Sequence, residues 1–174
     1  KYYRYEYDET YKVIAPKWSP YEAIAVPKNN GGAAPGDLII QQRTKEARIC
    51  YSTKKSDAIL LTSTNDLSED RVDFQVRFIP STDYIIANRY SILVKQFVQN
   101  LSAYTFYQTL SKMSGSESLL SQNQPGFLAG NIKSDTDNSE KVIGFFDVSA
   151  YSEKRIFFNF PDLFPTEKTP AYPY

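Results

Sequence analysis

Several absences narrow what this chain can be. Its 174 residues include no histidine and one cysteine, Cys50. Without histidine, the chain lacks the usual general base near neutral pH and the commonest zinc ligand. A single cysteine can form neither an intrachain disulfide nor a thiolate metal cluster. Histidine-dependent catalytic triads, zinc enzymes and zinc fingers are therefore excluded, and we expect no cofactor.

Charge and hydropathy exclude further classes. Basic and acidic residues number 20 each, so the chain lacks the electrostatic footprint that nucleic acid selects, and we expect no nucleic-acid partner. No apolar run approaches the ~20 residues that a membrane-spanning helix needs. The first residues, Lys1 to Tyr7, are polar and aromatic rather than signal-like, and the chain opens without methionine. We therefore expect a mature or trimmed product whose start lies upstream.

Aromatic residues are abundant. The chain has 14 Tyr and 11 Phe, and aromatics make up 15% of it. This usage suits twisted sheets, and it also suits surfaces that hold partners or sugars by stacking. A β-sheet core is the favoured interpretation of most of these residues.

Alternation of apolar and polar residues predicts strands along most of the chain. Two short strands, Arg48 to Ser52 and Ala58 to Thr62, flank a polar turn, and we expect them to pair as a hairpin. The other predicted strands are Tyr2 to Ile14, Val72 to Phe78, Tyr90 to Val98, Val142 to Val148 and Arg155 to Phe160.

One helix is predicted, from Ser102 to Ser114. Ser102 is the expected N-cap and Gly115 the expected C-terminal stop. The apolar residues between them repeat at helical spacing, so one stripe should pack on the sheet. The fold class that follows is mainly β, α+β: an antiparallel sheet or β-sandwich, with this helix near residues 102–114 covering one face or end.

The organisation predicted is one β-rich domain, residues 1–160. Pro16 to Gly36 is rich in Pro, Gly and Asn, which break both helix and ladder, so we expect an excursion loop over residues 16–36. The four prolines of Pro161 to Tyr174 predict an extended C-terminal arm, residues 161–174.

Aromatic residues on these two Pro-rich segments are the best binding candidates, because a sheet core does not need them. They are Trp18, Tyr21, Tyr172 and Tyr174. A docking surface for a partner and simple local packing remain the alternative interpretations.

Acidic residues offer a less specific signal. Asp135, Asp137 and Glu140 place three oxygen donors within six positions, but the glycine and distant glutamate of a calcium-binding EF-hand loop are absent. A solvated turn is favoured over a calcium site. The cluster Asp66, Glu69, Asp70 and Arg71 is likewise best explained as a turn rather than as paired catalytic carboxylates. Cys50, between two apolar neighbours in a strand, is expected to be buried.

The second half of the chain resembles a known family. The sequence segments that carry the resemblance are R-Y-S-I-L-V-K-Q-F (Arg89 to Phe97), S-A-Y-T-F-Y-Q-T-L-S-K (Ser102 to Lys112), Q-P-G-F-L-A-G-N-I (Gln124 to Ile132), E-K-V-I-G-F-F-D-V (Glu140 to Val148) and K-R-I-F-F (Lys154 to Phe158). Their order and spacing, with C-Y-S-T (Cys50 to Thr53) and L-S-E-D-R-V (Leu67 to Val72) before them, resemble domain of unknown function 4249, a lipoprotein family of Bacteroidota.

The resemblance implies a location and a kind of partner. Members look like lipoproteins anchored in the outer membrane through an N-terminal lipidated cysteine, with genes beside those of TonB-dependent receptors and an additional N-terminal β-sandwich region. Cys50 lies mid-strand and does not match the anchoring cysteine, so the resemblance implies the C-terminal portion of a longer protein, with its lipid anchor outside this chain. Which membrane face it occupies stays open, and the family offers no catalytic residues to carry over.

The leading functional expectation is a non-catalytic accessory lipoprotein that associates with a TonB-dependent receptor, or with other subunits of an outer-membrane complex, in nutrient uptake or surface assembly. One alternative is a structural surface protein that uses the two Pro-rich segments as docking arms. The other is a glycan- or peptide-processing enzyme built on two carboxylates, which needs no histidine.

Overall fold

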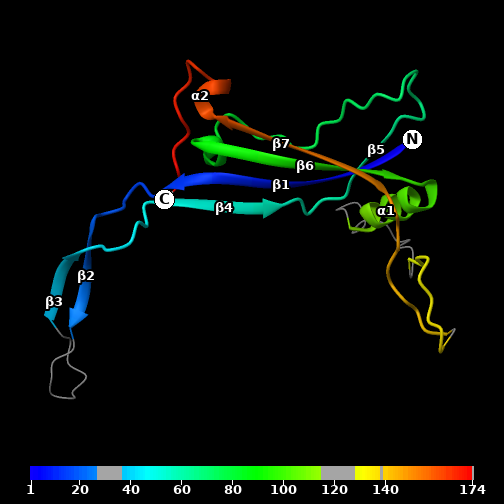
Figure 1. Ribbon diagram of the computed structural model, residues 1–174, viewed down its shortest axis with the longest axis horizontal. Coiled ribbons are helices and arrows are strands. Elements are labelled where there is room, and N and C mark those ends of the chain that lie inside the picture. The colour runs from blue at the N-terminus through cyan, green and yellow to red at the C-terminus, as the bar shows by residue number, and fades with distance from the viewer. Residues whose placement is uncertain (27–36, 115–127, 138, 174) are drawn as a thin grey trace.

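The computed structural model describes residues 1–26, 37–114, 128–137 and 139–173. Its centre is a five-stranded antiparallel sheet built around β1 (Tyr2–Ile14), as Figure 1 shows. On one side β1 pairs with β4 (Ile49–Lys55) and β5 (Leu60–Ser63). On the other side it pairs with β6 (Arg89–Gln99), which pairs in turn with β7 (Ala150–Asn159). The mainly β, α+β class is confirmed.

The long first strand is also confirmed, with the predicted bounds. Its alternating pattern places Tyr3, Tyr5 and Tyr11 on one face, where each is buried. The even-numbered residues of β1 lie on the opposite face, which is only partly covered. This strand is therefore the spine of the fold, hydrogen-bonded along both edges.

The predicted hairpin of the two short strands is wrong. β4 pairs with residues 8–14 of β1, and β5 pairs with residues 2–5 of the same strand. Both run antiparallel to β1, so they run in the same direction and cannot form a hairpin with each other. At the gap between them, Ser56 N–H donates to the Tyr7 carbonyl at 2.8 Å, and Tyr7 N–H donates to Ser56 Oγ at 3.0 Å.

The predicted strand Val72 to Phe78 is also wrong, although its alternation is real. The segment has no regular secondary structure and joins no ladder among the described strands. Val72, Phe74 and Val76 are half-buried, while the residues between them are exposed. Phe74 stacks on Tyr5 with ring centroids 5.5 Å apart. The period of two therefore reflects packing across a sheet face.

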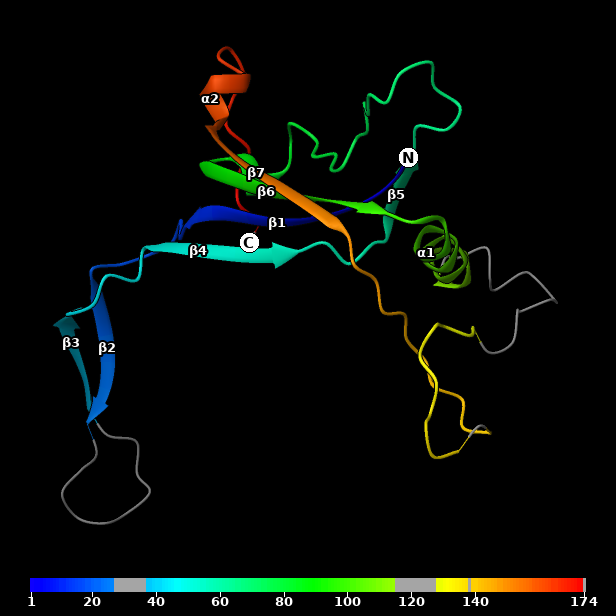
Figure 2. The same cartoon turned by 45° about the vertical axis from the view of Figure 1, so that its right-hand side comes forward.

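The predicted helix is confirmed as α1 (Leu101–Ser114), which lies at one end of the sheet (Figure 2). Its N-cap is Asn100 rather than Ser102: Asn100 Oδ1 accepts a hydrogen bond from Ala103 N–H at 2.8 Å. Arg4 reaches from the sheet to the helix, with its guanidinium 4.4 Å from the Phe97 ring centroid and 4.9 Å from that of Tyr107. The expected stop at Gly115 lies outside the described residues.

The segment that leads into β7 is not a strand over Val142 to Val148, contrary to prediction. A side-chain amide holds it instead: Asn131 donates to the Phe146 carbonyl and accepts from Phe146 N–H, both at 2.7 Å. Gly130 crosses the backbone of Gly144 so closely that a β-carbon at position 130 would overlap the Gly144 carbonyl. The G-N pair is thus a crossing point of two chain segments. The prediction of a terminal strand over Arg155 to Phe160 matches the second half of β7, which begins earlier, at Ala150, and ends at Asn159, whereas Phe160 starts α2.

The core lies where β1 and β6 meet a 3-10 helix, η1 (Tyr84–Ile86), and a short helix, α2 (Phe160–Leu163). Its buried members are Tyr11, Ile85, Ile86, Tyr90, Ile92 and Phe160. The predicted extended arm therefore needs correction, because the C-terminal segment folds back instead. Phe160 is only 1% exposed and Phe164 packs on it, with ring centroids 5.1 Å apart.

Candidate functional site

A hairpin projects from the sheet (Figures 1 and 2), and it carries several exposed apolar side chains. It consists of β2 (Tyr21–Val26) and β3 (Asp37–Gln42), which pair only with each other among the described strands. The predicted excursion loop is therefore partly a β-ribbon. Its composition misled the prediction because Pro16 and Pro20 lie before the first strand, while Pro27 and Pro35 lie between the strands, outside the described residues.

Apolar side chains lie on both faces of the hairpin, although one face also carries Glu22, Asp37 and Gln41. On one face Leu38 is 72% exposed and Ile40 73%, opposite Ala25 and Ala23. On the other face the cross-strand pair Ile24 and Ile39 is also exposed. A two-stranded hairpin is only marginally stable in water, and contiguous exposed apolar surface marks an interaction site more often than it marks a bare surface.

Polar contacts fix the base of the hairpin. Arg43 forms an ion pair with Glu22 at 3.0 Å, and its Nε donates to the Ser19 carbonyl at 3.1 Å. Its backbone N–H donates to the Pro20 carbonyl at 2.8 Å. These contacts join the two ends of the ribbon to each other at its base.

The four aromatic candidates do not form one site. Tyr21 lies at the base of the hairpin and is exposed, whereas Trp18 is half-buried just before it. Tyr172 lies elsewhere, on the C-terminal segment, and packs against Tyr84 with ring centroids 4.9 Å apart. Tyr174 is outside the described residues.

Tyr172 borders a small hollow at the end of β1. The hollow has a volume of about 160 Å³, and its wall includes Tyr84, Pro170 and Asn88. The hydrogen bond between the Tyr84 and Tyr11 hydroxyls is the main cause that raises the pKa of Tyr84 to about 12, and burial is the second cause. The Tyr84 hydroxyl therefore stays protonated at physiological pH.

The calcium candidate is a hydrogen-bonded turn in the structure. Asp137 Oδ1 accepts from the Ser139 hydroxyl at 2.6 Å and from Ser139 N–H at 2.8 Å, and both bonds lower the pKa of Asp137. Its backbone carbonyl accepts from Glu140 N–H at 3.1 Å. Asp135 adds no third ligand, because the described residues contain no group of three or more acidic, Cys or His side chains placed to hold a metal ion.

The acidic turn Asp66 to Asp70 ties down the start of the sheet. Asp70 Oδ1 accepts from the Tyr3 hydroxyl at 2.7 Å and from the Thr64 hydroxyl at 2.8 Å, and Asp70 also forms an ion pair with Lys1. Hydrogen bonds from Lys1, Tyr3 and Thr64 lower the pKa of Asp70 well below its usual range. This carboxylate is a structural anchor.

Cys50 is exposed, which corrects the expectation of burial. It lies in β4, an edge strand of the sheet, opposite Val13 of β1. The apolar neighbours Ile49 and Tyr51 that suggested a core position are 42% and 65% exposed.

A buried carboxylate was not predicted from the sequence. Glu9 is 4% exposed and accepts hydrogen bonds from the Tyr90 hydroxyl at 2.8 Å, from Arg77 Nε at 3.2 Å and from Arg77 Nη2 at 3.4 Å. The pKa of Tyr90 is raised well above its usual range, mainly because the hydroxyl is buried and also because it donates a hydrogen bond to Glu9. The only available signal was that Glu9 interrupts the aromatic face of β1.

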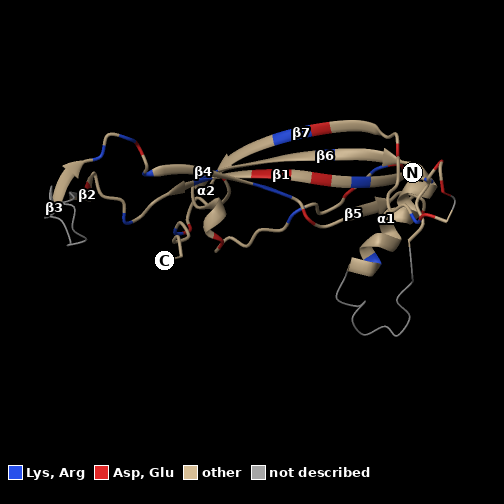
Figure 3. Ribbon diagram, turned by 90° about the horizontal axis from the view of Figure 1, so that it is seen from below, with Lys and Arg blue, Asp and Glu red and all other residues tan. Residues whose placement is uncertain are grey.

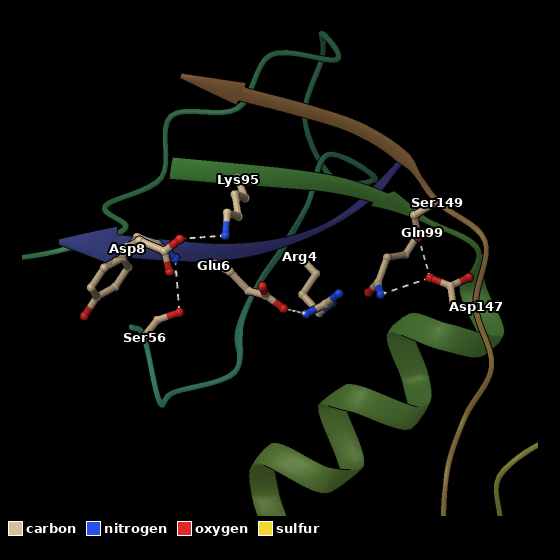
Figure 4. Close-up of polar contacts among 9 residues, drawn as sticks. Arg4, Glu6, Asp8, Ser56, Lys95, Gln99, Asp147 and Ser149 are labelled. Atoms are coloured by element: carbon tan, nitrogen blue, oxygen red, sulfur yellow. Dashed lines mark hydrogen bonds and ion pairs between the residues drawn. The ribbon is translucent and has the colours of Figure 1, made fainter. Parts of the chain in front are cut away.

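The opposite face of the sheet carries charges that pair with one another. Figure 3 shows acidic and basic residues interleaved along β1 and β7. Lys95 lies 2.7 Å from Asp8, and Arg4 bonds Glu6 beside it (Figure 4). Near α1, Asp147 accepts from Gln99 Nε2 at 3.3 Å. These contacts pair charged and polar side chains on a partly covered sheet face.

Comparison with known proteins supplies the family. Among the described residues, no helix has the length and apolar character to cross a bilayer. Neither the curated proteins nor the solved structures include a match. A family model matches residues 1–155, from the central strand through the crossing at Gly130 and into β7. The chain therefore belongs to the family described as domain of unknown function DUF4249.

Proposed function

We propose that this protein acts by binding: it is a non-catalytic accessory lipoprotein that associates with a TonB-dependent receptor of the outer membrane. The observation that carries the proposal is the β2–β3 hairpin, which leaves Leu38, Ile40 and Ile39 more than half exposed while its base is fixed by Arg43. The location and the receptor partner come from the family resemblance.

The shape of the hairpin favours a protein partner over lipid. Its two strands pair only with each other among the described strands, so its outer edges keep unpaired backbone N–H and C=O groups. Such groups are costly in hydrocarbon, but a partner strand or a polar-rimmed groove satisfies them. Because both faces carry exposed aliphatic side chains, a groove that encloses the ribbon would cover more of them than a flat surface.

A pull-down from native outer membranes tests the proposal. The tagged wild-type protein is expected to recover a receptor barrel, identified by mass spectrometry. The double variant Leu38→Ser/Ile40→Ser should recover at least about tenfold less, because each exposed aliphatic side chain that is buried on binding contributes on the order of 1 kcal/mol or more.

The matched control is Ile143→Ser/Val148→Ser, which removes two aliphatic side chains that are 78% and 80% exposed in the segment before β7. It should recover the receptor as the wild type does. The proposal fails if the wild-type protein recovers no receptor, or if the hairpin variant and the control recover equal amounts.

A further inference from the structure

Two adjoining hollows lie where the C-terminal segment passes the ends of the sheet strands. Figure 1 shows this segment running from α2 past the ends of β6 and β1. The first hollow is the one bordered by Tyr172, and the second has a volume of about 290 Å³. They share Lys12, Ala87, Asn88 and Thr169, so the two hollows adjoin each other.

The charge of these hollows is one-sided. Lys12 and Arg89 both line the second hollow, and among the described residues that line either hollow none is acidic. Neither cation forms an ion pair with a described carboxylate, unlike the paired Lys95 and Arg77 elsewhere on the sheet. The Arg89 guanidinium lies 5.3 Å from the ring centroid of Phe157, which lines neither hollow.

Neutral hydrogen-bonding groups surround the two cations. Asn159 lines the second hollow, where its amide already donates to Asp162 Oδ2 at 3.0 Å, and Asn88 and Thr169 line both hollows. The Asn88 amide donates to the backbone carbonyl of Lys12 at 3.4 Å, which ties the loop before β6 to the end of β1. Two cations with amide and hydroxyl neighbours are the chemistry that binds a carboxylate or a phosphate through charge-assisted hydrogen bonds.

The first hollow offers a different surface. Tyr84, Pro170 and Tyr172 present apolar faces, and Tyr172 remains 41% exposed although it packs on Tyr84. The volume of about 160 Å³ equals the space of about five water molecules, which suits one sugar ring. An exposed aromatic face beside polar groups is a common platform for such a ring.

We propose that the two hollows form one binding site for a small acidic sugar. Lys12 and Arg89 hold its carboxylate or phosphate group, and Tyr172 packs against its ring. This site is separate from the hairpin and does not depend on the proposed receptor association. It uses a segment beyond residue 155, the end of the family match.

Calorimetric titration of the full chain with four probes tests the site. Glucuronate and glucose 6-phosphate should bind saturably, at least about tenfold more tightly than neutral glucose, and their affinity should fall as salt rises. Inorganic phosphate separates recognition of the anion from recognition of the ring. If it binds as tightly as glucose 6-phosphate, the ring contact is overturned.

Variants locate the binding. Lys12→Gln and Arg89→Gln should each weaken binding of the acidic sugars by about 5-fold or more. Lys154→Gln, which removes an exposed cation outside both hollows, should leave it unchanged. Tyr172→Leu should weaken the acidic sugars but not inorganic phosphate. Urea midpoints equal to that of the wild type show that each variant is folded.

Two results would overturn the site. One is the absence of saturable binding of both acidic sugars to the folded wild-type chain. The other is equal weakening by Lys154→Gln and Lys12→Gln, because it would mean that the probes respond to overall charge rather than to these hollows.

Discussion

Replacing Arg77 with methionine should destabilise the protein by about 1–3 kcal/mol. In the wild type the Glu9 carboxylate, whose side chain is 5% exposed, accepts bonds from both Arg77 and Tyr90. Without Arg77 the carboxylate stays in the core with the Tyr90 hydroxyl as its one remaining partner. Breaking a fully buried ion pair costs about 3–5 kcal/mol, but the Arg77 side chain is 32% exposed, so water moderates the loss.

A second variant separates the ion pair from simple packing. Glu9→Leu/Arg77→Met removes both charges and keeps apolar volume, so it should lose less stability than Arg77→Met alone. Lys154→Met, at an exposed position, should change the free energy of unfolding by less than about 0.5 kcal/mol.

Urea unfolding followed by circular dichroism measures these differences as shifts of the midpoint at constant slope. The reasoning is refuted if Arg77→Met unfolds at the wild-type midpoint. It is equally refuted if the double variant is less stable than the single one, because uncompensated burial of the Glu9 charge would then not be the cause.

Three further predictions follow from single contacts. Asn100→Ala should lower the free energy of unfolding by about 1 kcal/mol, since it removes the N-cap of α1, whereas Ser102→Ala should change it by less than about 0.5 kcal/mol; urea midpoints compare the two. Because the pKa of Tyr90 is raised in the folded state, its contribution to the free energy of unfolding is fully present below the unfolded pKa of about 10 and is lost as pH rises above it. Unfolding measured at stepped pH from 8 to 12 should therefore show a steeper loss of stability in the wild type than in Tyr90→Phe. Phe160→Ala should cost about 3–5 kcal/mol because the side chain is 1% exposed, and a thermal midpoint close to that of the wild type would show that the C-terminal segment does not close the core.

The periodic pattern of apolar residues was sufficient to predict a strand or helix that buries one face along its whole length. The period-two run of β1 and the period-3.6 run of α1 both identify their elements, because each buries one face of a regular structure. The same reasoning could not choose the cap of α1, since Asn100 and Ser102 are both good N-cap residues and only the geometry of the chain entering from β6 selects between them.

Candidate sites were harder to foresee than elements. Pro-rich composition pointed to Tyr172, but the two hollows beside it also need Lys12, Asn88 and Arg89, which the sequence places in ordinary strand and turn contexts. The hairpin strands were hidden by the same Pro-rich composition. A site assembled from distant segments leaves no local sequence pattern, because its residues are close in space but have no regular spacing along the chain.

The sequence by itself determined the class of the protein: its missing histidine, its balanced charge, its aromatic strands and the words that match its family. The tertiary structure decided which strands pair. Val72 to Phe78 alternates like a strand, yet it joins no described ladder and packs on the sheet face instead, where Phe74 stacks on Tyr5. Alternation reports only that one face of a segment is buried, and pairing depends on which backbone edges remain free once the rest of the chain is in place.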